Sequence, residues 1–262
     1  MRHLLLAALL SAPAASLAAQ SVQGYRYTLV MRDDDDDEII ATAHAAGPLL
    51  RLDFPDKDGQ YLLSDARQRT VTIVRPAERE YSVTSDSGFE RILETAMEAA
   101  SVVVNLDVRD VRVAGERLGP GEAIGGRATQ RYRLTQEFTV RVGALGITGE
   151  TMRHRITTEY WVAPDVELPR NPVVELLASV ESVLAQHDAE FVRRTREARR
   201  TLFRGTPLRL EVTAQRLDEP DDAETRTIEV ADLQRVTLEP WLWRVPRDYE
   251  RREIEIAGWK LF

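Results

Sequence analysis

Two neighbouring segments with a strict two-residue period constrain the fold more than any other feature of the sequence. In 128–142, apolar side chains alternate with arginine, threonine and glutamate, and 152–162 repeats this alternation. A period of two is typical of a β-strand with one buried face and one wet face. A glycine-punctuated segment, 143–149, joins the two. The sequence therefore predicts a long antiparallel hairpin.

Other segments with the same period predict further strands. One face of segment 25–31 carries Tyr25, Tyr27, Leu29 and Met31. One face of segment 208–214 carries Leu208, Leu210, Val212 and Ala214. In 104–113 the apolar phase slips by one residue between Val108 and Val111. Such a slip predicts a β-bulge or a bend at this point.

Two segments have helical periodicity instead. Ser87, followed three residues later by Glu90, resembles a capping box and opens an apolar stripe over 87–103. Asn171 and Pro172 predict the start of a second helix, which ends before the glycine and proline of 205–207. Residues 20–262 are thus expected to form one α+β domain, a large curved antiparallel sheet with helices covering its concave face.

The first 19 residues predict an export signal. A basic start precedes the apolar run 4–10, and small residues follow, so cleavage is expected after Ala18 or Ala19. The apolar run is far shorter than the ~20 residues that span a bilayer. The chain has no cysteine, which excludes disulfides, thiolate metal sites and a bacterial lipid anchor. We expect a periplasmic or secreted protein that is neither membrane-spanning nor lipid-anchored.

The charge of the chain is acidic, with a formal net value of −8, which argues against nucleic acid as a partner. Its densest acidic run consists of Asp33, Asp34, Asp35, Asp36, Asp37 and Glu38. Because the run follows a predicted strand, we expect a solvated hairpin tip. Adjacent aspartates on an extended chain point to opposite sides, so the five aspartates are only weak Ca²⁺ candidates. A second acidic segment, 56–59 with Asp65, predicts a tight turn at Asp58 and Gly59 rather than a calcium loop.

No pattern in the sequence indicates catalysis. His44, His154 and His187 are scattered and lack the spacing of a zinc helix. His154 alternates with apolar residues on its strand, so we expect it to be half-buried and hydrogen-bonded. A nucleophile elbow, a P-loop and a dinucleotide fingerprint are all missing from the sequence. We expect no enzyme activity and no cofactor, and a hydrolase hidden from sequence motifs remains a third hypothesis.

The segment 190–204 is unusually rich in arginine. It contains Arg193, Arg194, Arg196, Arg199, Arg200 and Arg204. One interpretation is a solvated helix face whose cations complement the helix dipole. The other is a contact surface for anionic lipid head groups or for an acidic envelope protein. Both interpretations remain open at this point.

Several short motifs occur in a characteristic order. Segment 124–132 resembles the strand entry I-x-G-x-x-T-x-x-Y, and 161–165 resembles the strand exit W-V-x-x-D. The remaining motifs are a P-x-x-x-x-Y turn at 76–81, a G-x-P-L restart at 205–208 and, at 241–249, a segment that resembles a closing F-x-x-P-x-x-Y. Over roughly residues 70–250 this order is similar to a bacterial exported domain family of unknown function, related to the periplasmic lipoprotein carriers (LolA-like).

The resemblance implies an unclosed β-barrel, or half-barrel, whose hollow is covered by helices. It implies a soluble periplasmic carrier or binding protein for a lipid, an acyl chain or another hydrophobic ligand, and it supplies no catalytic residues. The apolar sheet face and both helical stripes are then expected to line the ligand cavity, with candidates Phe89, Leu93, Met97, Leu177, Val180 and Leu184. The alternative is a cell-envelope interaction module with a filled core, which uses the arginine-rich helix to bind a protein partner.

Overall fold

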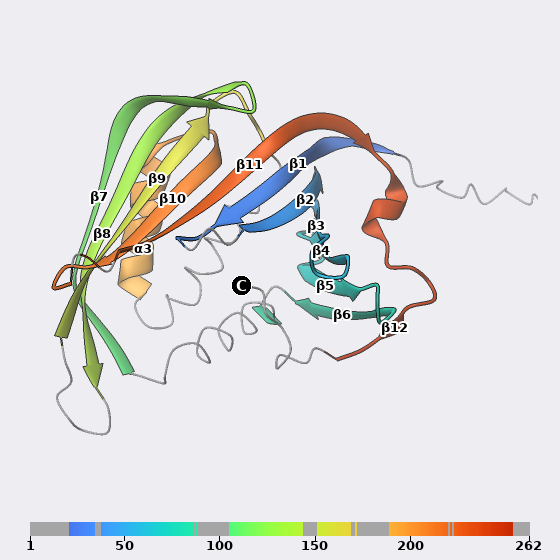
Figure 1. Cartoon of the computed structure of the whole chain (residues 1–262), viewed down its shortest axis with the longest axis horizontal. Helices are drawn as coiled ribbons and strands as arrows, with labels where there is room; N and C mark the ends of the chain where they lie inside the picture. The colour runs from blue at the N-terminus through green and yellow to red at the C-terminus, as the bar shows by residue number, and fades with distance from the viewer. Residues whose placement is uncertain are drawn as a thin grey trace, which may run out of the picture.

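The computed structural model describes residues 21–34, 38–85, 87–88, 105–143, 151–168, 171, 189–219, 221 and 223–253, with the backbone alone at 105–108 and 141–143. One large open sheet of twelve strands dominates these residues (Figure 1). The strands are β1 (Val22–Arg32), β2 (Glu38–Ala46), β3 (Leu49–Phe54), β4 (Gln60–Asp65), β5 (Thr70–Arg75), β6 (Glu80–Ser85), β7 (Asn105–Ile124), β8 (Arg127–Gly143), β9 (Thr151–Ala163), β10 (Thr206–Arg216), β11 (Ala223–Leu238) and β12 (Glu250–Arg251). The helical elements are α3 (Ala189–Leu202) and the 3₁₀ turn η1 (Pro240–Trp243).

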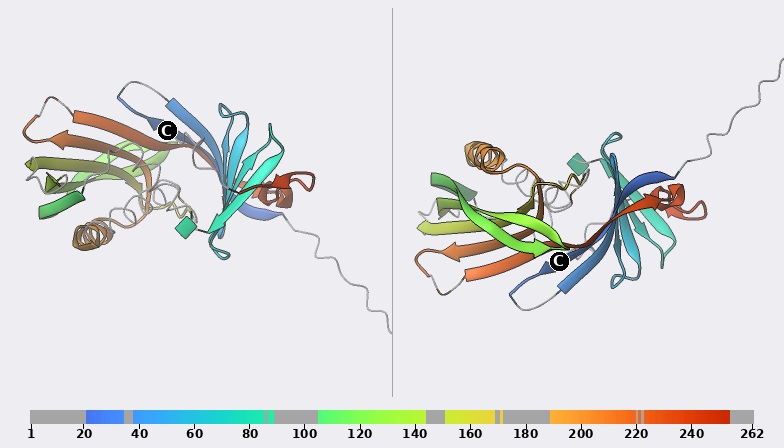
Figure 2. Two further views of the ribbon diagram at one scale, coloured as in Figure 1. Left: turned by 90° about the horizontal axis from the view of Figure 1, so that it is seen from below. Right: turned by 90° about the horizontal axis from the view of Figure 1, so that it is seen from above.

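The strand order across the sheet is β12-β6-β5-β4-β3-β2-β1-β11-β10-β9-β8-β7. Every neighbouring pair is antiparallel except β12 and β6, which are parallel over two residues. The N-terminal strand β1 is central, because it pairs with β2 on one side and with β11 on the other. The sheet curves strongly, as two views at right angles to the first make clear (Figure 2). A curved antiparallel sheet as the main architecture is therefore confirmed.

The predicted hairpin is confirmed as β8 and β9, which pair from Gln130↔Val162 to Arg141↔Thr151. Leu134 is buried, whereas its neighbours Arg133 and Thr135 are partly exposed on the opposite face. The predicted slip in 104–113 is also confirmed. The register of β7 on β8 shifts between Arg109 and Arg112, and Asp110 between them has a φ of 53°.

The two acidic segments form turns. β1 and β2 remain paired up to Arg32↔Glu38, which places the acidic run at a hairpin tip. There the Asp34 carboxylate accepts a hydrogen bond from the backbone N–H of Thr225. Asp33 is exposed, and Asp35, Asp36 and Asp37 lie outside the described residues.

The second turn joins β3 to β4. Asp58 and Gly59 both have positive φ values, 53° and 69°, as a tight Asp-Gly corner requires. The Asp65 carboxylate accepts hydrogen bonds from the backbone N–H groups of Arg67 and Gln68 in the following turn. Asp65 therefore caps the turn after β4, a role that was not predicted from the sequence.

The described part of the second predicted helix is α3, which ends at Leu202, shortly before Gly205 as expected. Near the first predicted helix, the expected cap needs correction. Ser87 is already helical, and the side chain that accepts the backbone N–H of Gly88 is Ser85, at 3.0 Å. A serine oxygen three residues before the donor has the usual cap geometry, so Ser85 takes this role. Segments 89–104 and 172–188 lie outside the described residues, and helices over the concave face stay a prediction.

Gly205 sets the connection from α3 to β10. Its φ is 115°, and a Cβ there would lie 2.7 Å from the Ala163 carbonyl oxygen and 2.9 Å from the Cα of Pro164. We expect Gly205→Ala to lower the free energy of unfolding by about 2 kcal/mol, measured by urea denaturation, because both backbone strain and a backbone clash result. Gly47→Ala is the control: its φ is 53° and nothing lies within 4 Å of its Cβ position. Equal losses at the two glycines would contradict the clash.

Candidate ligand-binding face

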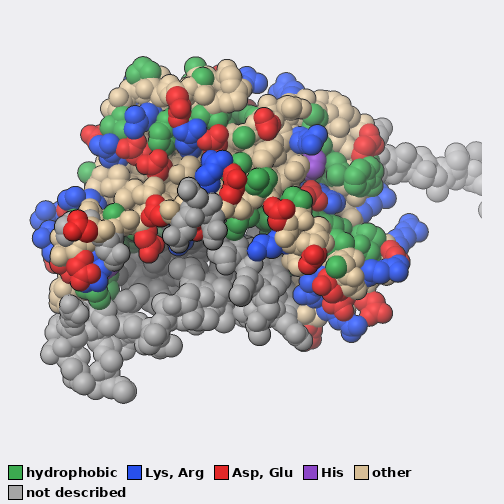
Figure 3. All heavy atoms as spheres, viewed as in Figure 1, with side chains coloured by type: hydrophobic (Ala, Val, Ile, Leu, Met, Phe, Trp, Pro, Cys, Tyr) green, Lys and Arg blue, Asp and Glu red, His purple; other side chains and the backbone are tan. Residues whose placement is uncertain are grey.

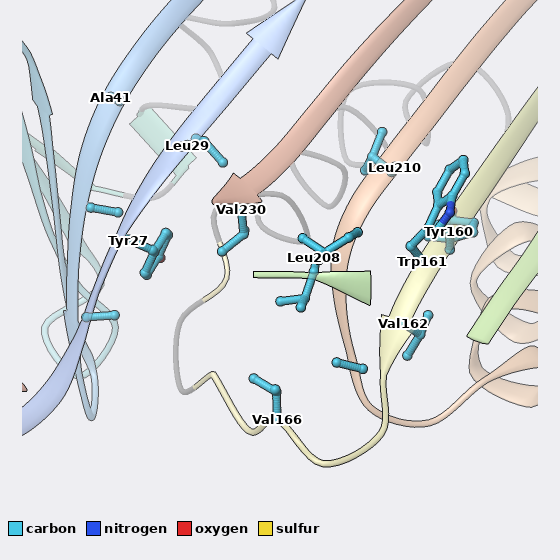
Figure 4. Close-up of a cluster of buried hydrophobic side chains, with 14 of the residues drawn as sticks. Tyr27, Leu29, Ala41, Tyr160, Trp161, Val162, Val166, Leu208, Leu210 and Val230 are labelled. Atoms are coloured by element: carbon cyan, nitrogen blue, oxygen red, sulfur yellow. The ribbon is translucent and has the colours of Figure 1, made fainter. Parts of the chain in front are cut away.

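One face of the sheet is apolar across most of its strands. We call it the apolar sheet face, and its buried members belong to one hydrophobic cluster (Figure 4). They are Tyr27, Leu29, Ala41, Ala43, Ala45, Leu50, Leu134, Tyr160, Leu208, Leu210 and Val230. These side chains come from β1, β2, β3, β8, β9, β10 and β11. Strand pairing alone brings them together, since alternate residues of each strand point to the same side.

Small residues line the middle of this face. In β2, Ala41, Ala43 and Ala45 are fully buried and point to the same side. Ala43 lies between Tyr27 of β1 and Leu52 of β3, so a methyl group separates two large side chains. These alanines are the smallest side chains of the apolar sheet face. The alternation of alanine in 41–45 could have indicated these small buried positions. None of the three alanines was among the predicted cavity residues.

Helix α3 packs on this face at β7 and β8, and Phe203, directly after the helix, packs on β9. The Phe191 ring lies 5.2 Å from that of Phe138, and the Phe203 ring lies 4.9 Å from that of Tyr160. Between these contacts, Gln136 donates a buried 2.8 Å hydrogen bond to the hydroxyl of Thr195. A buried hydrogen bond between two apolar contacts fixes the register of the helix on the strands.

His154 belongs to the same face, half-buried as expected. Its ring stacks on Phe138 at 5.6 Å, so the contact is aromatic rather than the expected hydrogen bond. Burial lowers the pKa of His154 below its ordinary value, and the positive charge of Arg216 on the neighbouring strand lowers it further. A neutral, ring-stacked histidine fits a packing role. His187 lies outside the described residues.

The opposite face of β8–β11 is charged, and arginines alternate with acidic side chains over it (Figure 3). At its centre, the Glu159 carboxylate accepts hydrogen bonds from both Arg131 and Arg133. Burial raises the pKa of Glu159, but the hydrogen bonds from the two guanidinium groups outweigh it, so the pKa lies below its usual range. Trp161 is buried beside these groups, with Arg131 and Arg209 over its ring at 5.0 and 5.4 Å.

A largely buried arginine, Arg51, anchors the C-terminal strap, residues 239–253, which runs from the end of β11 to β6. Arg51 of β3 holds Asp53 at 2.6 Å and donates a 3.0 Å hydrogen bond to the carbonyl of Leu242. Its guanidinium also lies 3.8 Å from the centre of the Tyr61 ring. His44 Nδ1 is 3.5 Å from Asp53 Oδ2, at the limit of hydrogen bonding. The strap covers this group of Arg51, Asp53, Tyr61 and His44, and the contacts of Arg51 hold the strap on the sheet.

The predicted cavity candidates cannot be placed. Phe89, Leu93, Met97, Leu177, Val180 and Leu184 all lie outside the described residues. The arginine-rich segment is placed, and much of its charge is internally paired. Arg193 bonds Glu190 and Glu197, and Arg194 bonds Glu190 and the carbonyl of Val111.

The other arginines of the segment differ in exposure. Arg196 and Arg199 are half-buried, whereas Arg200 and Arg204 are exposed. Arg193 and Arg194, which both donate hydrogen bonds to Glu190, lower the pKa of that carboxyl to about 2. A role of this helix in binding a partner stays a prediction.

Known types of site and known proteins give little further guidance. Among the described residues, no group of three or more histidine, aspartate or glutamate side chains is arranged to hold a metal ion. Within the same residues, no helix is both long and apolar enough to cross a membrane. No protein-family model matches the sequence, and no curated protein matches it either.

Proposed function

We propose that the protein is a soluble periplasmic carrier or binding protein for an acyl chain or another hydrophobic ligand. The observation that supports this proposal is the continuous apolar sheet face, which extends over seven strands of an open, curved sheet. An open sheet of this kind, closed by helices on its concave side as a half-barrel, is suited to enclose a chain-like ligand. A ligand space of roughly 300–1,000 Å³ is required.

The chemistry of the apolar sheet face fits such a ligand. Most of its described members are aliphatic or aromatic, and two of the buried polar groups on or against it, Gln136 and Thr195, are hydrogen-bonded to each other. A polar ligand would find few hydrogen-bonding partners there, whereas an acyl chain needs none. The buried alanines of β2 are the positions where the face lies deepest, because they carry the smallest side chains.

Native mass spectrometry tests the proposal directly. We would purify the protein from the envelope of cells that export it, measure the intact mass, and analyse the organic extract for lipids. A stoichiometric lipid or acyl adduct supports the carrier and identifies its cargo. A clean mass for the apo protein, together with no uptake of fluorescent fatty acids, removes the proposal and favours the interaction module.

Replacing Ala43 by a larger side chain distinguishes a protein with a ligand space over Ala43 from one with a filled core. If a ligand occupies the space over Ala43, Ala43→Leu fills it, and we expect fatty-acid uptake to fall about tenfold, a change of about 1.4 kcal/mol. The free energy of unfolding of the apo protein should then change by less than about 1 kcal/mol. Uptake is measured by fluorescence titration, and stability by urea denaturation.

The matched control is Ala114→Leu, because Ala114 is exposed on β7. This variant should bind and unfold as the wild type does. If the core is filled, Ala43→Leu overpacks it and costs about 1–3 kcal/mol of stability. That loss of stability in a protein without measurable uptake would count against the carrier.

A further inference from the structure

We propose that the end of the sheet that carries η1 docks on the surface of a lipid bilayer, with Trp241 as the side chain that enters the interface. Among the described residues, the large hydrophobic side chains that are exposed are Trp241, Val22 and Ile40. Trp241 is 63% exposed, far more than Val22 at 40% or Ile40 at 37%. Tryptophan is favoured at membrane–water interfaces because its ring is amphipathic.

The strap holds Trp241 outward. The next residue, Leu242, is buried, and Trp243 packs against the small cluster of Ala46 and Leu238. Arg51 clamps the turn by its hydrogen bond to the Leu242 carbonyl. The side chains after Trp241 are thus tied to the sheet, and a rigid turn presents the tryptophan. Because the backbone of the turn is already held, little backbone entropy is lost when the exposed tryptophan enters an interface.

The position of this turn points to a bilayer as its partner. Val22, the first residue of β1, pairs with Leu238 directly before η1, and β1 begins beside η1 in all views (Figures 1 and 2). The expected leader, residues 1–19, ends only two residues before β1, about 7 Å of extended chain, so it is attached at the same end of the sheet as η1.

The exposed apolar groups are distributed unevenly between the two ends of the sheet. Val22 and Trp241 lie at the end where β1 starts and β11 finishes. Ile40 lies near the opposite end, beside the acidic hairpin tip where Arg32 pairs with Glu38. An anionic bilayer repels that acidic tip. The end bearing Trp241 is therefore the one that can approach a membrane. This docking surface deepens the proposed function, because a lipid carrier must meet a membrane to load or deliver its cargo.

Vesicle binding tests the inference with a matched pair of variants. The purified mature chain is mixed with vesicles of phosphatidylcholine, with and without phosphatidylglycerol, some carrying brominated acyl chains. We expect the wild type to co-sediment with both kinds of vesicle and its tryptophan fluorescence to be quenched by bromine. Trp241→Ser should weaken binding about tenfold. Trp241→Phe should retain most of it, and Ile40→Ser should leave it unchanged.

Each result decides the inference. A wild type that does not bind vesicles, or equal binding by Trp241→Ser and the wild type, overturns it. A loss in Ile40→Ser as large as that in Trp241→Ser also overturns it, because docking is then not confined to one end. The inference rests on the proposed function, but the readouts are separate: fatty-acid uptake without vesicles should not depend on Trp241. Docking that depends on Trp241 in a protein without ligand uptake removes the carrier and leaves the docking surface.

Discussion

Asp53→Asn is expected to lower the free energy of unfolding by about 3 kcal/mol at pH 7, because it leaves the buried guanidinium of Arg51 without its counter-charge. Arg51 is only 13% exposed, and it meets Asp53 at 2.6–3.0 Å. Truncating one partner of a buried ion pair costs more than the pair contributes, since the remaining charge stays desolvated. Urea denaturation at pH 7 measures the loss.

A pair of similar length on the surface provides the comparison. Arg32 and Glu38 lie 2.7 Å apart, but both are exposed at the hairpin tip. Glu38→Gln should cost no more than about 0.5 kcal/mol, because solvent screens the pair. If both substitutions cost the same, burial is not the reason that Asp53 matters.

The effect at Asp53 should also depend on pH. Burial raises the pKa of Asp53, but His44 and Arg51 lower it more, so the net value lies below 3.8 in the folded protein. A depressed carboxylate pKa adds stability above the unfolded value, near pH 4, and this stability is lost as the pH falls through the folded value. The difference between the wild type and Asp53→Asn should thus be complete at pH 6 and shrink below pH 4. A difference that grows on acidification would contradict this sign.

Local patterns in the sequence predicted local structure well. The alternation in 128–142 and 152–162 led to β8 and β9, and the phase slip between Val108 and Val111 led to the register shift in β7. The Asp58-Gly59 corner followed from the conformations these two residues accept. In each case the cause lies within a few residues of the effect, so one sequence suffices.

The order of the strands in the sheet could not be predicted from these local patterns. Periodicity states which face of a strand is buried, but it does not state which strand lies beside it. Leu29 of β1 pairs with Val230 of β11, and nothing near either residue in the sequence indicates the other. The central position of β1 therefore came only from the structure.

Buried charges were also missed, for a related reason. Alternation assigns the charged positions of a strand to water, yet Arg51 is enclosed by the strap and by Tyr61. Tyr160 and Trp161 are neighbours on opposite faces of β9 and both are buried, which a two-residue period cannot predict. Coverage of the second face depends on segments that are distant in the sequence. The candidate site shows the same limit, because the alanines of β2 gain their meaning only from Tyr27 and Leu52 beside them.

Glu159→Gln is expected to lower the free energy of unfolding by about 2 kcal/mol at pH 7, since two guanidinium groups lose one shared carboxylate. Glu159 is 13% exposed, and Arg133 reaches it with two hydrogen bonds of 2.6 and 3.0 Å. The control is Glu116→Gln, which removes a 2.9 Å bond to the same arginine from a carboxylate that is 56% exposed. It should cost about 0.5 kcal/mol or less.

The pH dependence at Glu159 follows from its depressed pKa. The two arginines favour the charged carboxylate in the folded protein, where the pKa lies below the ordinary value of 4.5. The stability that Glu159 adds is therefore fully present above about pH 5, and it is lost as the pH falls through the folded pKa. Denaturation of the wild type and Glu159→Gln at pH 7 and pH 3 measures this change. Because Glu159 and its two arginines lie on the face opposite the apolar sheet face, Glu159→Gln should leave fatty-acid uptake unchanged. A loss of uptake without a loss of stability would place the ligand on the charged face and refute the assignment of the apolar sheet face.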